Sequence, residues 1–198
     1  MVTRSRVVRS SLLALGAMLF GLNTAPGFTA QNPSGRVTLQ ELVKRMDRQT
    51  RLTISARVDK QTYSVDDAAT FEIVIRNTGA GPIYIYERLG LGDCCSLEVL
   101  VFDATGKQLL TNPFAHNFVD LPPERTEFMR LFGKHFIGRH FTLPLRNYFL
   151  IEKPGRYTFV LEYHNPVPER DSFGLDVWSK EMGSIYSNPI QIEVIATK

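Results

Sequence analysis

The sequence predicts an all-β fold, an antiparallel sandwich of about seven strands with one short helix near its N-terminal end. Apolar and polar residues alternate with a period of two in successive segments, which is typical of strands that bury one face. Glycine, proline and Asn-Pro steps separate these segments at short intervals, as turns do in antiparallel sheets. The alternating segments are residues 52–58, 71–77, 83–86, 97–101, 157–163 and 189–194, with weaker strand patterns near 127–132 and 138–143.

A short helix is predicted before the first strand. Thr38 and Glu41 have the spacing of a capping box, in which each side chain bonds to the backbone N–H of the other residue. Apolar residues then follow at helical spacing up to Met46. We expect a helix from about residue 39 to residue 49 that covers one end of the sheet, after a polar lead-in at residues 31–36.

The first thirty residues have the composition of an export signal. Three arginines precede a short apolar run, residues 12–22, and small residues follow at positions 24–30. That order is typical of a secretory signal peptide, and the run is shorter than the ~20 residues that a membrane-spanning helix requires. We expect cleavage after Gly27 or after Ala30, so the mature protein is predicted to be secreted or periplasmic.

Removal of residues 1–30 changes the charge of the chain. The full sequence has 23 Lys and Arg against 20 Asp and Glu, and the signal segment holds three Arg and no acidic residue. The mature chain therefore carries no net charge, which gives it no electrostatic reason to bind nucleic acid or anionic lipid. No membrane span is expected after cleavage. Residues 31–51 are expected to form a linker and a short helix, and residues 52–198 are expected to form one domain. The sequence does not determine its oligomeric state.

A motif before the strand at 157–163 resembles the tyrosine corner of Ig-like and fibronectin-like domains. Within Ile151–Tyr157, an apolar residue is followed by Pro154 and Gly155 and then by the tyrosine that opens the strand. In such corners the tyrosine hydroxyl bonds to the backbone a few residues upstream and fixes the connection between the sheets. The resemblance implies a structural role for Pro154, Gly155 and Tyr157.

Residues 63–77 and 187–194 extend this resemblance. The pattern Tyr-x-Val-x-Asp, then Phe-x-Ile-x-Ile-x-Asn, and the closing Ser-Asn-Pro-Ile-x-Ile-x-Val are similar to the Ig-like domain family of intracellular proteinase inhibitors. The resemblance covers most of residues 52–195 and implies an Ig-like β-sandwich. It also implies one alternative function, protease inhibition through an exposed loop, for which Arg130 and Arg139 are candidates because turn formers flank them.

Cys94 and Cys95 are the only cysteines, and they are adjacent. In an oxidising compartment this pair has four possible states: a vicinal disulfide, two unpaired or buried thiols, an intermolecular disulfide and a metal site. The vicinal ring is strained, because neighbouring Cα atoms lie closer than is usual for a disulfide. Strained disulfides are more readily reduced, so this pair is a candidate redox switch.

No motif for catalysis or metal binding is present. The sequence lacks the nucleophile elbow Gly-x-Ser-x-Gly and the phosphate-binding motif Gly-x-x-x-x-Gly-Lys-Ser/Thr. The histidines lack the convergent spacing of metal ligands. They are His116, His135, His140 and His164. We therefore expect that the protein is not an enzyme and has no metal and no cofactor.

Two sets of aromatic residues are candidates for binding. Tyr84 and Tyr86 share one strand face and, with Trp178, are candidates for a sugar-stacking platform, with core packing as the alternative. Phenylalanines are expected to pack the long insertion onto the sandwich or, if that insertion moves, to form an exposed patch that binds partners. They are Phe114, Phe118, Phe128, Phe132, Phe136 and Phe141.

These observations together predict a secreted or periplasmic, non-catalytic Ig-like binding module. Its binding surface is expected at one end of the sheets, formed by the Gly90–Ser96 loop, the insertion at residues 111–140 and the loop at residues 165–184 that carries Trp178. The expected partner is a protein or a glycan of the cell envelope or extracellular space. The alternatives are a proteinase inhibitor and a carbohydrate-binding accessory domain.

Overall fold

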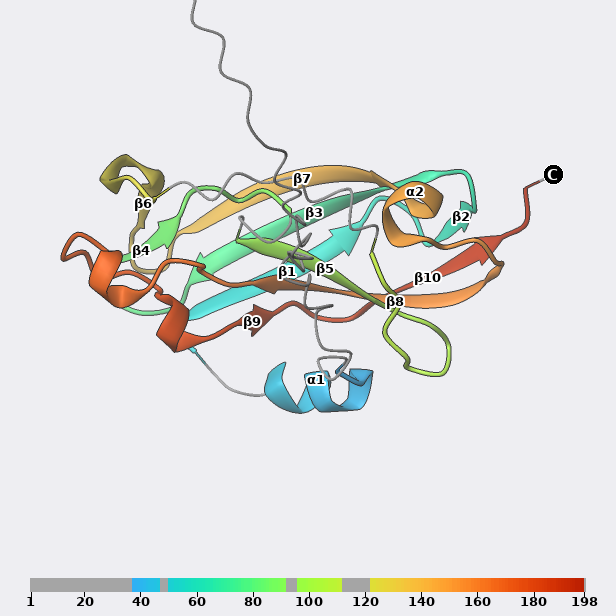
Figure 1. Cartoon of the computed structure of the whole chain (residues 1–198), viewed down its shortest axis with the longest axis horizontal. Helices are drawn as coiled ribbons and strands as arrows, with labels where there is room; N and C mark the ends of the chain where they lie inside the picture. The colour runs from blue at the N-terminus through green and yellow to red at the C-terminus, as the bar shows by residue number, and fades with distance from the viewer. Residues whose placement is uncertain (1–36, 47–49, 92–95, 112–121, 198) are drawn as a thin grey trace, which may run out of the picture. The chain divides into compact units, whose positions relative to one another are not determined.

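Two β-sheets lie face to face and form the Ig-like β-sandwich that the sequence predicts (Figure 1). The computed structural model describes residues 37–46, 50–91, 96–111 and 122–197, which belong to the unit Arg36–Lys198. The first sheet has the strand order β1-β3-β7, and the second has the order β2-β10-β8-β5, with β9 paired to β8. Strands β4 and β6 form a separate antiparallel pair.

The strands and helices have the following bounds. The strands are β1 (Leu52–Val58), β2 (Thr62–Ser64), β3 (Ala68–Asn77), β4 (Ile83–Tyr86), β5 (Leu97–Phe102), β6 (Phe128–Leu131), β7 (Phe136–Pro144), β8 (Gly155–Tyr163), β9 (Ile185–Tyr186) and β10 (Ile190–Ile195). The α-helices are α1 (Leu39–Met46) and α2 (Leu145–Phe149), and short 3-10 helices are η3 (Arg125–Glu127), η4 (Glu169–Asp171) and η5 (Lys180–Met182).

Period-two patterning places the strands and fills the core. In β1 and β3 the apolar residues are buried and the intervening residues are exposed or half-buried, because successive side chains of a strand point to opposite faces. Phe71 from β3, Phe159 from β8 and Phe149 from α2 meet between the sheets, with ring centroids 5.0–6.0 Å apart. This aromatic cluster joins the two sheets through α2.

Three short elements were not predicted from the sequence. The two-residue β9, the three-residue β2 and the five-residue α2 are too short for a period to be visible. Strand β2 pairs in parallel with β10, so the second sheet departs from the predicted purely antiparallel pattern at this edge. Tyr63 lies in β2 with its side chain buried, and the chain turns directly after this strand, where the Asp67 N–H donates to the Ser64 carbonyl oxygen (3.0 Å).

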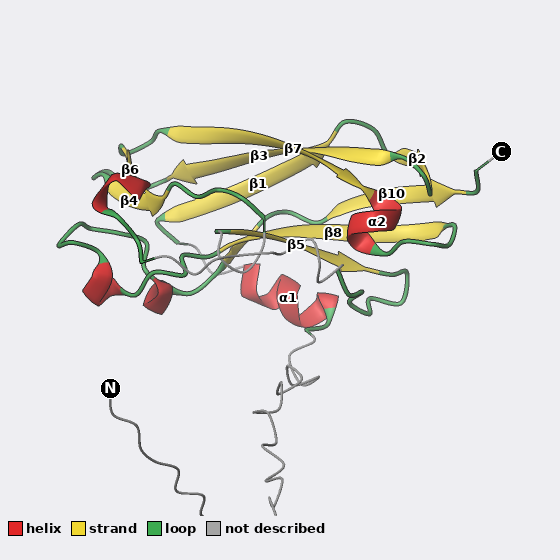
Figure 2. Cartoon of the chain, turned by 45° about the horizontal axis from the view of Figure 1, so that its top comes forward, coloured by secondary structure: helices red, strands yellow, loops and turns green. Residues whose placement is uncertain are grey.

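Helix α1 begins with the predicted capping box. The Thr38 N–H donates to a carboxylate oxygen of Glu41 (2.9 Å), and the Glu41 N–H donates to the Thr38 hydroxyl (3.3 Å). The helix lies on the outer face of the second sheet and not over a sheet end, because its buried Leu42 packs with Leu100 of β5 and Val160 of β8 (Figure 2). No helix in the described part of the chain is long and apolar enough to cross a membrane.

Candidate functional site

The aromatic residues proposed as a sugar-stacking platform lie mostly in the interior. Trp178 is 5 % exposed, and its indole Nε1 donates to the Gly183 carbonyl oxygen (2.9 Å). Tyr86 is 3 % exposed and packs against Phe128, with ring centroids 5.6 Å apart. Tyr84 alone is half-buried. Tyr86 and Trp178 therefore follow the core-packing alternative and do not form an exposed platform, because the loop that carries Trp178 covers the face of β4 on which Tyr84 and Tyr86 lie.

The two arginines considered for an inhibitory loop lie in paired strands. Arg130 is in β6 opposite Tyr84 of β4, and Arg139 is in the middle of β7 opposite Ile73 of β3. A loop that enters a protease cleft must be exposed and free of sheet pairing. The structure contradicts the assignment of these two residues to such a loop, because the weak strand patterns of this region form strands β6 and β7.

Tyr157 makes the type of bond that a tyrosine corner requires. Its hydroxyl donates to the Lys153 carbonyl oxygen at 2.8 Å, and the pKa of Tyr157 is raised mainly by burial. Gly155 opens β8 with a φ of 157°, and a Cβ there would contact the Tyr157 ring. Pro154 precedes this glycine in the turn between α2 and β8.

Several candidate residues lie outside the described part of the chain. Cys94, Cys95, His116, Phe114 and Phe118 are among them, so the redox prediction and half of the expected loop surface stay predictions. Within residues 37–46, 50–91, 96–111 and 122–197, no group of three or more acidic residues or histidines is placed to hold a metal ion.

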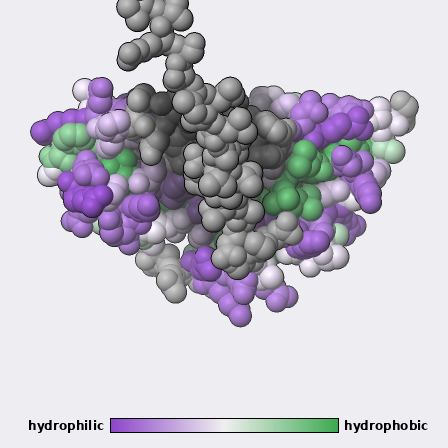
Figure 3. Space-filling model, in the orientation of Figure 1, coloured by the Kyte–Doolittle hydropathy of each residue, from purple (hydrophilic) through white to green (hydrophobic). Residues whose placement is uncertain are grey.

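A cluster of aromatic and basic side chains lies at the turn between β6 and β7. Figure 3 shows hydrophobic residues beside hydrophilic ones at the end of the sandwich that carries β4 and β6. Phe132 is 50 % exposed and Phe136 is 58 % exposed, so these two rings do not pack onto the sandwich as one reading of the sequence expected. We call this cluster the basic–aromatic tip and define it as Arg76, Arg130, Phe132, Lys134, His135 and Phe136.

Each exposed ring of the tip has a guanidinium group over it. The Arg130 Cζ lies 4.7 Å from the centroid of Phe132, and the Arg76 Cζ lies 5.1 Å from the centroid of Phe136. The His135 and Phe132 rings are 5.7 Å apart. Arg76 and Phe136 are direct cross-strand partners on the outer face of the first sheet, which fixes their spacing.

The backbone of the tip is held by a buried asparagine. Asn77 at the end of β3 has no exposed surface, and its amide donates to the carbonyl oxygens of Leu131 (3.0 Å) and Gly81 (2.8 Å). Gly133 approaches the next turn so closely that a Cβ would lie 2.1 Å from the Ala80 carbonyl oxygen. Lys134 adopts a positive φ of 66° to complete the turn. The tip is therefore a fixed turn on a rigid pair of strands.

The basic residues of the tip have no carboxylate partner among the described residues. The six ion pairs of the described chain involve other basic residues, such as Arg57 with Glu72 and Arg51 with Asp176. The Lys134 ammonium instead donates to the Thr78 carbonyl oxygen (2.5 Å). The tip consequently presents uncompensated positive charge beside apolar rings, although residues 31–198 together carry no net charge.

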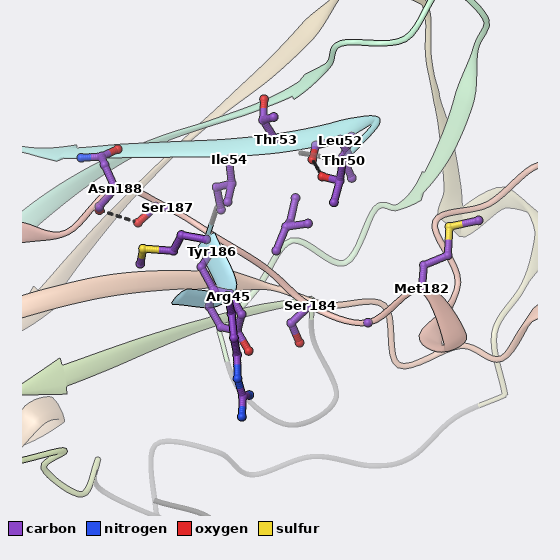
Figure 4. A pocket seen from close by; sticks show the side chains of 13 residues that line it. Arg45, Thr50, Leu52, Thr53, Ile54, Met182, Ser184, Tyr186, Ser187 and Asn188 are labelled. Atoms are coloured by element: carbon purple, nitrogen blue, oxygen red, sulfur yellow. Dashed lines mark hydrogen bonds between the residues drawn. The ribbon is translucent and has the colours of Figure 1, made fainter. Parts of the chain in front are cut away.

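A cavity of about 700 Å³ lies between the free edge of β1, the segment after η5 and the end of α1 (Figure 4). In Figure 4, Ile54 points from β1 toward the segment that carries Ser184 and Tyr186, whereas Thr53 points to the other side of the strand. Burial and the nearby Glu162 carboxylate raise the pKa of Tyr186, and Ser184 and Arg45 partly offset that rise. None of the residues that line this cavity was predicted from the sequence to bind a ligand.

Comparisons with known proteins leave the family open. No protein-family model and no curated protein matches the chain. Two structures of the CARDB domain of PF1109 from Pyrococcus furiosus are similar at a TM-score of 0.36 and 13% identity; the solution structure aligns over 74% of this chain and 96% of that domain. The crystal structure, in complex with di-metal ions, aligns over 76% and 100%.

A β-glucosidase, EmGH1 from Erythrobacter marinus, is similar at a TM-score of 0.36 and 9% identity over 73% of this chain. The match spans 15% of the length of that enzyme. Similarities this low carry no conclusion about ligand or activity. The resemblance to intracellular proteinase inhibitors accordingly stays a prediction.

Proposed function

We propose that this chain is an exported, non-catalytic binding module that recognises an acidic protein partner through the basic–aromatic tip. The observation that carries the proposal is the pair of exposed phenylalanine rings, Phe132 and Phe136, each with an arginine over it that no described carboxylate neutralises. Arginine and aromatic residues supply most of the binding energy in many protein interfaces.

The stacked arginines suit a carboxylate ligand for geometric reasons. A guanidinium that lies over a ring keeps its N–H donors at the ring edge, where they can bind a carboxylate in a bidentate manner. Stacking also limits the rotamers of Arg76 and Arg130 before the partner arrives, so less side-chain entropy is lost on binding. The apolar rings add area that a partner can bury beside each ion pair.

The same stacking favours a protein partner over a glycan or a bilayer. Sugar binding uses an open ring face, and here one face of each ring is covered by a guanidinium. Membrane insertion needs apolar side chains that project beyond the backbone, whereas Phe136 lies on the sheet face beside Arg76. Burial of Tyr86 and Trp178 removes two further residues from the glycan alternative.

Binding at the tip can be tested with acidic peptides of defined sequence. We expect a Glu-rich peptide to bind the full chain and its Gln-rich counterpart not to bind, in fluorescence anisotropy at low salt. The double variant R76Q/R130Q should weaken binding about tenfold, since two exposed charge pairs of about 0.5–1 kcal/mol each are lost. The variant F132A should also weaken binding.

Two variants serve as matched controls for this measurement. R170Q removes an equal charge from an arginine that is 84% exposed on its side chain and lies outside the tip, and L110A removes an exposed apolar side chain elsewhere. Both should bind like the wild type. Equal losses for R170Q and the tip variants would show a general charge effect and contradict the proposal.

Export is tested separately through the N-terminus. We expect the full chain, expressed in a bacterial host, to be recovered outside the cytoplasm with a mass that corresponds to cleavage after Gly27 or Ala30, because residues 1–30 have the order of a secretory signal. A chain that lacks residues 1–30 should stay in the cytoplasm. Recovery of the uncleaved full chain from the cytoplasm would contradict export.

A further inference from the structure

Every second residue of β1 directs its backbone N–H and C=O groups away from β3, toward the free edge of the first sheet. The Thr78 N–H donates to the Arg51 carbonyl oxygen (2.9 Å), and the Asp59 N–H donates to the Thr70 carbonyl oxygen (3.1 Å). Odd-numbered residues along this strand therefore bond to β3, since the bonded pairs of an antiparallel ladder alternate. The even-numbered residues of β1 present their N–H and C=O groups to the open edge, and Ile54 is central among them.

Side chains occupy this edge on both sides of Ile54. On one side, the Thr50 hydroxyl donates to the Leu52 carbonyl oxygen. On the other, the Asn188 amide imitates a neighbouring strand, because it accepts from the Ala56 N–H (3.1 Å) and donates to the Ala56 carbonyl oxygen (3.0 Å). Both backbone groups of Ala56 and the carbonyl oxygen of Leu52 thus have side-chain partners, whereas neither backbone group of Ile54 between them has a partner among the described residues.

The Ile54 rung faces the cavity of Figure 4. Ile54 is only 7 % exposed, and buried backbone N–H and C=O groups nearly always have a hydrogen-bond partner. Here that partner has to come from the contents of the cavity. A volume of about 700 Å³ is in the range of pockets that bind ligands, and it is larger than one water molecule needs.

The charged residue that lines the cavity indicates which class of ligand it would bind. Arg45, in the last turn of α1, is the only charged residue among the described residues that line it. It has no ion pair with a described carboxylate. Ser184 and Tyr186 add hydroxyl groups, and Met46 and Met182 add adaptable apolar surface.

We propose that this cavity binds an extended acidic peptide segment, which adds one rung to β1 at Ile54 and places a carboxylate near Arg45. The backbone of the segment exchanges N–H···O bonds with Ile54, as one residue of an added antiparallel strand does. Asn188 blocks pairing at Ala56 and Thr50 occupies the Leu52 carbonyl oxygen, so Ile54 is the position at which both backbone groups are open. This site differs from the basic–aromatic tip, because it lies along the β1 edge of the first sheet, whereas the two exposed rings of the tip lie in β7 and in the turn before it.

The test uses an acetylated and amidated pentapeptide, Thr-Val-Glu-Val-Thr, with variants that carry Gln or Lys at the centre. Titration of the ¹⁵N-labelled full chain to about 5 mM peptide covers weak affinities. We expect the Glu peptide to shift the amide signals of Ile54 and Tyr186 and to slow hydrogen exchange at Ile54. N-methylation of the central residue of the peptide should abolish the shifts, because the donor to Ile54 is lost.

A pair of helix variants tests the role of Arg45. R45Q should weaken Glu-peptide binding about threefold to fivefold and leave the Gln peptide unchanged, as expected for one exposed charge pair. K44Q removes the same charge from the neighbouring exposed residue, which does not line the cavity, and should have no effect.

Three results would overturn the proposal. One is the absence of any shift at Ile54 with the Glu peptide, and another is equal binding of the Glu, Gln and Lys peptides. The third is a set of shifts confined to β7 or to the tip, which would support the proposed function and not this site.

Discussion

Replacement of Phe159 by alanine is expected to lower the free energy of unfolding by about 3–5 kcal/mol, the range for large-to-small changes of fully buried aromatic residues. Phe159 in β8 has no exposed surface, and its ring lies 5.3 Å from that of Phe71 and 5.0 Å from that of Phe149. These three residues come from both sheets and from α2. The cavity left by F159A would therefore open where the layers meet, and no single element can move to fill it.

Urea denaturation followed by Trp178 fluorescence measures this loss, because the buried indole becomes exposed on unfolding. The matched control is F136A, which removes the same side chain from a position that is 58 % exposed. Surface substitutions of that kind usually change stability by less than about 0.5 kcal/mol. A loss below about 1 kcal/mol for F159A would show that the aromatic cluster does not hold the sheets together.

The predicted fold was confirmed where strands are long enough to show a period. In β3 the alternation of Phe71, Ile73 and Ile75 with more polar residues matches one buried and one outer face. Phe132 and Phe136 of the tip were predicted as candidates for an exposed patch, and Arg130 as a candidate for a different role. What the sequence does not contain is the cross-strand register that places Arg76 beside Phe136, because β3 and β7 are far apart in the chain.

Strand β4 shows why burial of the candidate site was harder to predict. Ile83 and Ile85 lie in the main core, and Tyr86 on the other face is buried as well. Val167 and Val177, which follow much later in the chain, cover that face. Period-two patterning distinguishes the faces of a strand, but it does not show that a distant loop covers the second face.

The cavity beside β1 could not be predicted from the sequence, for a related reason. Its lining combines the end of α1, the edge of β1 and the segment after η5, and no motif joins these three segments. The open N–H and C=O groups of Ile54 result from the alternation of hydrogen bonds along β1 and not from the type of residue, since any residue except proline would present the same backbone groups there. Sequence patterns carry side-chain information, and this site is defined by the main chain.

Asn77 is the position at which stability and the proposed binding surface should respond together. N77A is expected to lower the free energy of unfolding by about 2–4 kcal/mol, because it removes three hydrogen bonds and leaves their backbone partners without replacement. Two of these partners are the Leu131 and Gly81 carbonyl oxygens, and the third is the Gly79 N–H, which donates to the Asn77 side-chain oxygen at 2.9 Å.

The same substitution should weaken acidic-peptide binding at a temperature where the chain is still folded, since Asn77 joins the β3–β4 turn to the strand that leads into the tip. T78A is the matched control: the Thr78 hydroxyl bonds to the Thr50 and Arg51 carbonyl oxygens and not to the tip, so this variant should lose about 1 kcal/mol and bind peptide normally. Urea denaturation and anisotropy titration measure the two effects. If N77A and T78A lose equal stability and bind equally well, the buried asparagine does not position the tip, and the preorganisation on which the proposed function rests has to come from the Gly133 turn alone.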